Sequence, residues 1–184
     1  MTRKPYGAKL TVYEARRAMA MRWDERSGTF YRIVFEADQD QVLAGARHPE
    51  GRFHHGGLPA LYLSCRADWA AKAIETYRQP GDPRRLAVPL QVERAKIVDL
   101  RRADHCAQLS IQKLDAAVPW RPQRQRGQPA DSWRPADIVR SSQADGMVYP
   151  ARSAPERWHL VLFRWNALGG PTITAAGAAT LVPE

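Results

Sequence analysis

Hydrophobic residues recur along the chain in short segments whose spacing changes between that of strands and that of helices. The segment TFYRIVF at 29–35 is rich in aromatic and β-branched residues and predicts a strand, and ALYLS at 60–64 predicts a second one. Apolar residues of segment 66–77 fall on one helical face, which predicts a helix there. A shorter helix is expected at 11–21, before the first strand.

The middle of the chain has weaker patterns. Residues 86–92 and 95–100 predict two short strands or one bent strand. Pro89 lacks a backbone N–H, which favours an edge or an interrupted strand for the first of them. Residues 115–135 hold four prolines, several arginines and little hydrophobic period, so we expect a long loop.

The last third returns to regular patterns. Residues 133–142 predict a helix, and residues 146–149 and 159–165 predict strands. From position 168 onward, Gly, Ala and Thr dominate, which indicates an edge strand and a loose tail. Strands and helices are therefore interspersed without a regular alternation, and this order favours a mixed α+β domain over a doubly wound parallel sheet.

The composition fits one globular domain with a basic surface. The chain has 184 residues, a usual length for one domain, and 28 Lys and Arg against 19 Asp and Glu give a net charge of +9. Most of the basic residues are arginines, whose planar head holds phosphate or carboxylate through two parallel hydrogen bonds. The excess favours a phosphate-bearing ligand or an acidic partner, although a codon bias toward arginine would give the same count. Arginines between Trp120 and Arg134 could also follow a nucleic-acid backbone, but a solvated basic loop is the simpler reading.

Several classes of protein lose support. The apolar segments are too short to span a membrane, and no apolar leader follows the N-terminus, so we expect a cytoplasmic protein. Cys65 and Cys106 do not make a disulfide scaffold. The histidines and cysteines lack the paired spacing of a metal site, so no metal is expected. The chain also lacks GxxxxGK[ST], GxGxxG, HExxH, CxxC and GxSxG.

A series of motifs in a fixed order carries the strongest signal. The first half holds YR at 31–32, GRFHHGG at 51–57, ALYLS at 60–64 and AAKAIETY at 70–77. The second half holds VDLR at 98–101, DGMVYPARSAP at 145–155 and HLVLFRWN at 159–166. Together these resemble the RES domain, the toxin of bacterial Xre-RES toxin–antitoxin pairs. On this resemblance we expect a RES domain at 29–166, after an N-terminal helical extension at 1–28 and before a C-terminal strand and tail at 167–184.

The resemblance implies a fold and an activity. The fold would be a single compact α+β domain similar to ADP-ribosyltransferase toxins, with a mixed, mostly antiparallel central sheet and flanking helices. The substrate would be NAD, whose nicotinamide–ribose bond is cleaved by hydrolysis or phosphorolysis, with ADP-ribosyl transfer to a protein as a variant. The implied partner is a cognate Xre-type antitoxin, through which any contact with nucleic acid would be indirect. The chain could also form a homo-oligomer.

Residue by residue, the resemblance implies three catalytic side chains, Arg32, Glu75 and Ser153. It further implies that NAD contacts Arg52, Tyr62, Gly51, His54 and Tyr31. The chemistry fits, because two arginines can clamp a pyrophosphate and glycines let the backbone approach it. A carboxylate can stabilise the oxocarbenium-like ribose that forms when nicotinamide leaves. The alternatives are that Arg32 and Glu75 are a buried structural pair and that Tyr62 is a core residue.

The serine is where the chain departs from the family pattern. Tyr149–Pro150 is followed by Ala151, where the family tends to have serine. Either Ser153 takes that role by a two-residue shift, which would keep the same face in a strand, or the role is lost. Also, Phe53–His54 stands where the family often has tryptophan and asparagine. A second hypothesis is therefore a catalytically weakened RES fold that binds nucleotides or a partner, and a third is a basic nucleic-acid-binding protein.

Overall fold

The computed structural model describes residues 23–183. The helix expected at 11–21 lies outside the described residues. The strands of the described residues are β1 (Asp24–Phe35), β2 (Leu61–Ser64), β3 (Arg85–Asp99), β4 (Gly146–Pro150), β5 (Trp158–Leu162), β6 (Thr172–Ala175) and β7 (Thr180–Leu181). Their α-helices are α2 (Ala67–Ile74), α3 (Ala103–Gln108), α4 (Trp120–Gln125) and α5 (Trp133–Ser141). Three short 3-10 helices are η1 (Glu36–Gln41), η2 (Glu75–Tyr77) and η3 (Asp115–Ala117).

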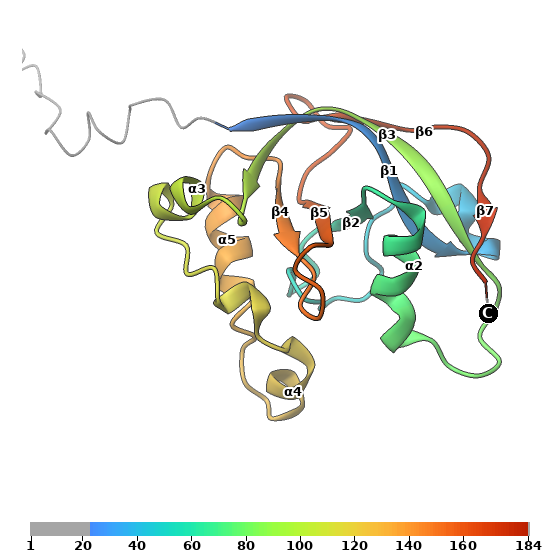
Figure 1. Cartoon of the computed structure of the whole chain (residues 1–184), viewed down its shortest axis with the longest axis horizontal. Coiled ribbons are helices and arrows are strands. Elements are labelled where there is room, and N and C mark those ends of the chain that lie inside the picture. Colours follow the sequence, from blue (N-terminus) through green and yellow to red (C-terminus); the bar gives the residue numbers. More distant parts are fainter. Residues whose placement is uncertain (1–22, 184) are drawn as a thin grey trace, which may run out of the picture.

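Five of the strands pair in a closed ring. They follow one another in the order β1, β2, β5, β4 and β3, and β3 then pairs back with β1. Only β3 and β4 are parallel among the strand pairs of the described residues, and β6 and β7 extend the sheet from β3. Helices α3 and α5 lie on one side of β4, and α2 lies on the other side of the molecule (Figure 1). The predicted α+β domain with a mixed, mostly antiparallel sheet is confirmed.

The first strand is longer than the sequence pattern indicated. It begins at Asp24 rather than at position 29, because Asp24, Glu25 and Arg26 pair with residues of β3. The register shifts between Arg26 and Gly28, where Gly28 takes a φ of +139°. Such a bulge breaks the alternation of side chains and hides the strand from a pattern search. The boundary expected at 28 therefore falls inside β1.

The third strand is one continuous bent strand. Arg94 bends it with a φ of +55°. Around Pro89 the strand pairs with β1 and also with β6 and β7, so the edge-strand prediction is wrong. The carbonyl of Pro89 accepts a hydrogen bond from the N–H of Ala176 at 2.9 Å, on the side away from β1. The N and C=O of one strand residue point the same way, so the missing N–H faces the gap between β6 and β7.

The prediction of a long loop at 115–135 is wrong in part, because the segment contains η3, α4 and the start of α5. Pro122 is the third residue of α4, and Pro135 is the third residue of α5. The first N–H groups of a helix have no partner inside the helix, so proline costs no hydrogen bond at these positions. Pro122 and Pro135 therefore lie in the first turns of two helices and are compatible with them.

Two cores share the sheet. One fills the inside of the ring and includes Phe30, Val148 and Leu160. The other lies between the outer face of β2, β5 and β4 and the helices α3 and α5, and includes Tyr149 and Val161. Neighbouring strand residues alternate between the two cores, as the pleat of a strand requires. No helix within residues 23–183 is long and apolar enough to cross a membrane.

Candidate active site

A row of polar side chains crosses the outer face of the sheet. Tyr31 of β1 lies opposite Ser64 of β2, Ser64 lies opposite His159 of β5, and His159 lies opposite Tyr149 of β4. Side chains that are directly opposite on paired strands share one face, so these four lie in one row. Tyr62 precedes Ser64 by two residues and therefore points to the same face.

The glycine-rich turn is fixed to this face by a chain of hydrogen bonds. His54 Nε2 donates to the carbonyl of His48 at 2.9 Å, which leaves its Nδ1 as an acceptor for the hydroxyl of Tyr62 at 2.9 Å. The same hydroxyl accepts from the N–H of Phe53 at 3.0 Å. Burial lowers the pKa of His54 and raises the pKa of Tyr62, so both side chains stay neutral near pH 7.

Gly51 is required by this arrangement. A Cβ at Gly51 would lie 2.3 Å from Cε1 of His54, closer than any real contact of a Cβ. Its N–H donates to the carbonyl of His54 at 2.8 Å, and its own carbonyl accepts from Nε1 of Trp133 at 2.8 Å. The structure thus gives Gly51 and His54 internal partners, and their predicted contact with NAD stays a prediction.

Arg52 supplies a half-buried positive charge beside the row. Its Nη2 and Nε donate to the carbonyl of Ala116 at 2.8 and 3.2 Å, and its guanidinium lies 5.0 Å from the ring centre of Tyr149. Burial lowers the pKa of Arg52, with Arg152 as a further positive neighbour. No carboxylate within residues 23–183 forms an ion pair with it. A half-buried cation that has only neutral partners is a natural place for a bound anion.

Tyr77 and Arg121 belong to the same region. Tyr77 lies in η2, and Arg121 of α4 stacks on its ring with the guanidinium 4.0 Å from the ring centre. Tyr77 is close enough to influence the ionisation of Arg52 and Tyr149. The segment from η3 to α4, which carries Ala116 and Arg121, therefore borders the row of polar side chains.

Arg32 lies apart from this group. Along β1 it alternates with Tyr31 and points to the same side as Phe30 and Val34, which belong to the core inside the ring. Its guanidinium donates to the carbonyls of Val42 and Gly45. Burial, together with Arg47, lowers its pKa to about 10. In this structure Arg32 therefore holds the segment after η1. Its side chain points away from the face of Arg52, and its predicted catalytic role stays a prediction.

Glu75 is also separate from Arg32. It is the first residue of η2, and its carboxylate forms an ion pair with Lys72 at 2.6 Å while 56% of the side chain is exposed. The alternative of a buried Arg32–Glu75 pair is therefore wrong, because Glu75 is at the surface and Arg32 bonds to carbonyls.

Ser153 lies past the end of its strand. β4 ends at Pro150, and Ser153 is exposed in the bend that follows, so strand alternation does not place its side chain on the face of Tyr149. Ala151 does continue the register, because its N–H donates to the carbonyl of Arg157 at 2.7 Å. The position where the family pattern has serine is thus on the face of Tyr149 and has only a methyl group.

Sequence reasoning missed the pair at the centre of the row. Ser64 Oγ and His159 Nδ1 are 2.7 Å apart in a hydrogen bond, and both residues are buried. Burial lowers the pKa of His159 to about 4, and Arg52 and Arg157 act in the same direction. Two signals could have revealed the pair: Tyr62 and Ser64 alternate in ALYLS, and a histidine begins the apolar strand HLVLF.

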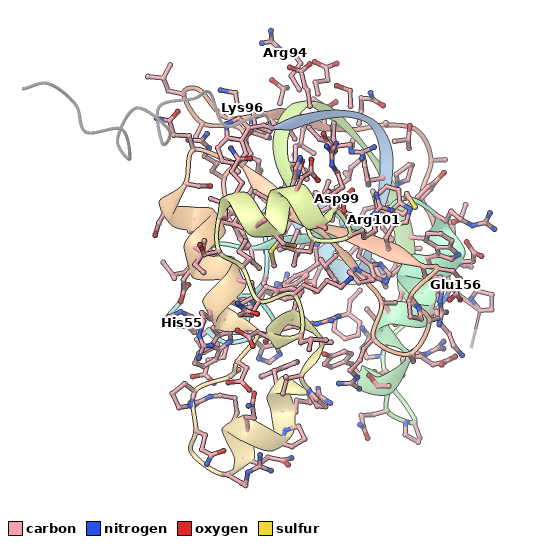
Figure 2. All side chains as sticks on the ribbon, turned by 60° about the vertical axis from the view of Figure 1, so that its left-hand side comes forward. His55, Arg94, Lys96, Asp99, Arg101 and Glu156 are labelled. Atoms are coloured by element: carbon pink, nitrogen blue, oxygen red, sulfur yellow. The ribbon has the colours of Figure 1, made fainter. Side chains whose placement is uncertain are left out.

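The VDLR segment at 98–101 has a structural role. Asp99 is buried at the end of β3 and accepts hydrogen bonds from the backbone and guanidinium of Arg101, whose Nη2 lies 2.6 Å from the carboxylate (Figure 2). Burial alone would raise the pKa of Asp99, but these bonds and the charge of Arg26 lower it.

No group of three or more His, Cys, Asp or Glu side chains in the described part of the chain is arranged to hold a metal ion.

Comparison with known proteins agrees with these motifs. A family model described as "RES domain" matches residues 14–181. The chain belongs to the RES domain family. The RES domain match is longer than the expected 29–166 and reaches into both flanking segments. A search of curated proteins gives no match.

Among solved structures, this RES domain is similar to MbcT in the crystal structure of the M. tuberculosis MbcT–MbcA toxin–antitoxin complex. The two are 15% identical, the match covers 86% of this chain and 85% of that chain, and the TM-score is 0.50. At this identity the likeness concerns the fold.

Proposed function

We propose that this RES domain is a toxin that cleaves the nicotinamide–ribose bond of NAD and that a cognate Xre-type antitoxin neutralises it in the cytoplasm. Two findings support the proposal. The family model covers most of the chain, and the structural neighbour is part of a toxin–antitoxin complex.

The observation that carries the proposal is the half-buried charge of Arg52, which has only neutral partners. It lies against Tyr149 on the face where Tyr62, Ser64 and His159 also meet, and it has no acid to neutralise it among the described residues. The pyrophosphate of NAD supplies the missing negative charge and can exchange with the Ala116 carbonyl as the acceptor for the guanidinium. Tyr77, which is 40% exposed and close to Arg52, offers an aromatic ring for a base of NAD.

The reaction needs little from the protein beyond binding and charge. The C1′–N bond breaks and nicotinamide leaves as a neutral molecule with the bonding electrons. Water or phosphate then forms a new C–O bond at the same carbon, which is numbered C1″ in ADP-ribose: water gives ADP-ribose and a proton, and phosphate gives ADP-ribose 1″-phosphate. A protein side chain as the acceptor would give ADP-ribosyl transfer.

In this account Glu75 stabilises the positive ribose. Its ion pair with Lys72 is exposed, so exchanging that partner for the ribose costs little.

Glutamate substitutions with a matched control test the proposal. Purified wild-type chain, Glu75→Gln and Glu36→Gln are incubated with NAD, with and without phosphate, and the products are separated by chromatography. Glu36 is the control because it is also a glutamate of a 3-10 helix, in an ion pair with Arg84 and 49% exposed. We expect nicotinamide release from the wild type and Glu36→Gln and a loss of at least about 100-fold in Glu75→Gln. Equal rates in Glu75→Gln would refute the role of Glu75, and no release from the folded wild type would refute NAD cleavage.

A second candidate is a RES fold that binds nucleotides or a partner without turnover. Ala151 favours it, since the family serine is absent there. Binding of NAD by the wild type without any nicotinamide release would select this candidate over the first.

A further inference from the structure

The missing serine and the buried Ser64–His159 pair are neighbours on the sheet. The register of β4 and β5 pairs Tyr149 with His159 and continues to Ala151 and Arg157. Ala151 therefore lies on the same face as Tyr149 and diagonal to His159, at a separation that a long side chain can bridge. A serine at 151 would have its hydroxyl on the same face of the sheet as the imidazole of His159.

The Ser64–His159 pair leaves one ring nitrogen unused. Nδ1 of His159 is taken by the Ser64 hydroxyl at 2.7 Å, and no group within residues 23–183 bonds to Nε2. Ser64 thereby fixes the orientation of the ring, as the second partner of a functional histidine commonly does. In either tautomer Nε2 offers one hydrogen bond, as a donor or as an acceptor.

The surroundings of His159 favour a ribose attached to phosphate. The ring centre of Tyr149 lies 5.5 Å from that of the imidazole, and the guanidinium of Arg52 lies 5.0 Å from the same tyrosine ring centre. Arg52 and Arg157 are the charged groups that act on His159, and both disfavour a second positive charge on the ring. The site thus combines a cation for phosphate with a neutral polar group, and a ribose hydroxyl can both donate to and accept from that group.

We propose that His159, oriented by Ser64, hydrogen-bonds a ribose hydroxyl of NAD through Nε2 and so supplies the polar contact that Ala151 cannot make. In this scheme His159 is a substrate-binding residue and Ser64 is a positioning residue. The inference rests on the proposed function, because it assumes that NAD binds on the face of Arg52.

Two substitutions separate the nitrogen atoms of His159. The amide of Asn reaches the place of Nδ1, and the longer amide of Gln reaches the place of Nε2. His159→Gln should therefore keep more activity than His159→Asn, for which we expect kcat/KM to fall by about 100-fold. Ser64→Ala should lower activity, and Ser64→Thr, which keeps the hydroxyl, should restore part of it.

A matched control is His105 in α3. It is also 5% exposed and uses Nδ1 for an internal bond, accepting from the N–H of Asp99 at 3.0 Å. His105→Gln should therefore change the stability but leave kcat/KM of the folded protein unchanged.

The measurements are nicotinamide release and NAD binding, with thermal unfolding to establish that each variant is folded. His159→Asn more active than His159→Gln would show that only the Ser64 bond matters and would overturn the inference. Full activity of both His159 variants beside an active wild type would also overturn the inference, but that result would leave the proposed function intact. A folded wild type that neither binds nor cleaves NAD overturns both.

Discussion

Replacing Gly51 by alanine tests whether the glycine-rich turn serves the protein or the ligand. The added Cβ would lie 2.3 Å from Cε1 and 2.7 Å from Nδ1 of His54. The imidazole is enclosed, with 3% of the residue exposed, so it has to leave its place to avoid the methyl group. The change therefore breaks the bonds from His54 to Tyr62 and to the carbonyl of His48.

The magnitude follows from those two bonds. Each contributes about 1 kcal/mol, and the partly buried hydroxyl of Tyr62, which loses a partner, adds about 1 kcal/mol or more. We expect Gly51→Ala to lower the free energy of unfolding by about 3 kcal/mol. For a domain of this size that corresponds to a fall in Tm of about 6–12 °C.

A double-mutant cycle with His54→Ala isolates the cause. Urea unfolding is measured for the wild type, both single variants and the double variant. Without the imidazole the methyl group meets no ring, so Gly51→Ala should cost less than about 1 kcal/mol in the His54→Ala background. Gly170→Ala is the control, because its nearest contact, the carbonyl oxygen of Ala167 at 3.3 Å, would have to shift by only a few tenths of an ångström. An equal cost in both backgrounds would refute the explanation, as would a Gly51→Ala variant of wild-type stability that has lost NAD binding.

Gly146, Arg52 and His159 offer further tests. Gly146→Ala should destabilise the protein more than Gly51→Ala in a thermal scan, because its Cβ would lie 2.1 Å from the carbonyl oxygen of Val161, which is backbone; equal stability would contradict this. Arg52→Met should raise the Kd for NAD by at least about 10-fold in calorimetry while the fold is kept, and an unchanged Kd would exclude Arg52 as the phosphate ligand. The pKa of His159 falls to about 4 in the fold from 6.5, so between these pH values the unfolded state binds more protons and stability rises with pH by about 1.4 kcal/mol per unit. In urea unfolding at several pH values, His159→Asn should be less pH-dependent by that amount, and an unchanged slope would contradict the burial of a neutral ring.

Much of the fold follows from local patterns. The strands at 60–64 and 146–149 and the helix at 66–77 were predictable because their apolar residues have one clear period. The bulge before Gly28 and the bend at Arg94 interrupt that period, which concealed the full lengths of β1 and β3. Pro122 was misread because proline disfavours a helix only beyond its first turn.

The candidate site shows a different limit. Motif order led to Arg52 and Tyr62, which the structure brings together with Tyr149. It could not show that Arg32 and Tyr31 point to opposite sides of β1, since that depends on which face is inside the ring. The Ser64–His159 bond joins residues 95 positions apart and depends on the register of two strands, which one sequence does not contain.

The most direct measurement is nicotinamide release from NAD by the purified wild-type chain beside Arg52→Met, with folding of both checked by thermal unfolding. We expect release by the wild type and a loss of at least about 10-fold at subsaturating NAD in Arg52→Met. A folded wild type that releases no nicotinamide, or an Arg52→Met variant with the same rate as the wild type, would contradict the claim that this face of the sheet cleaves NAD.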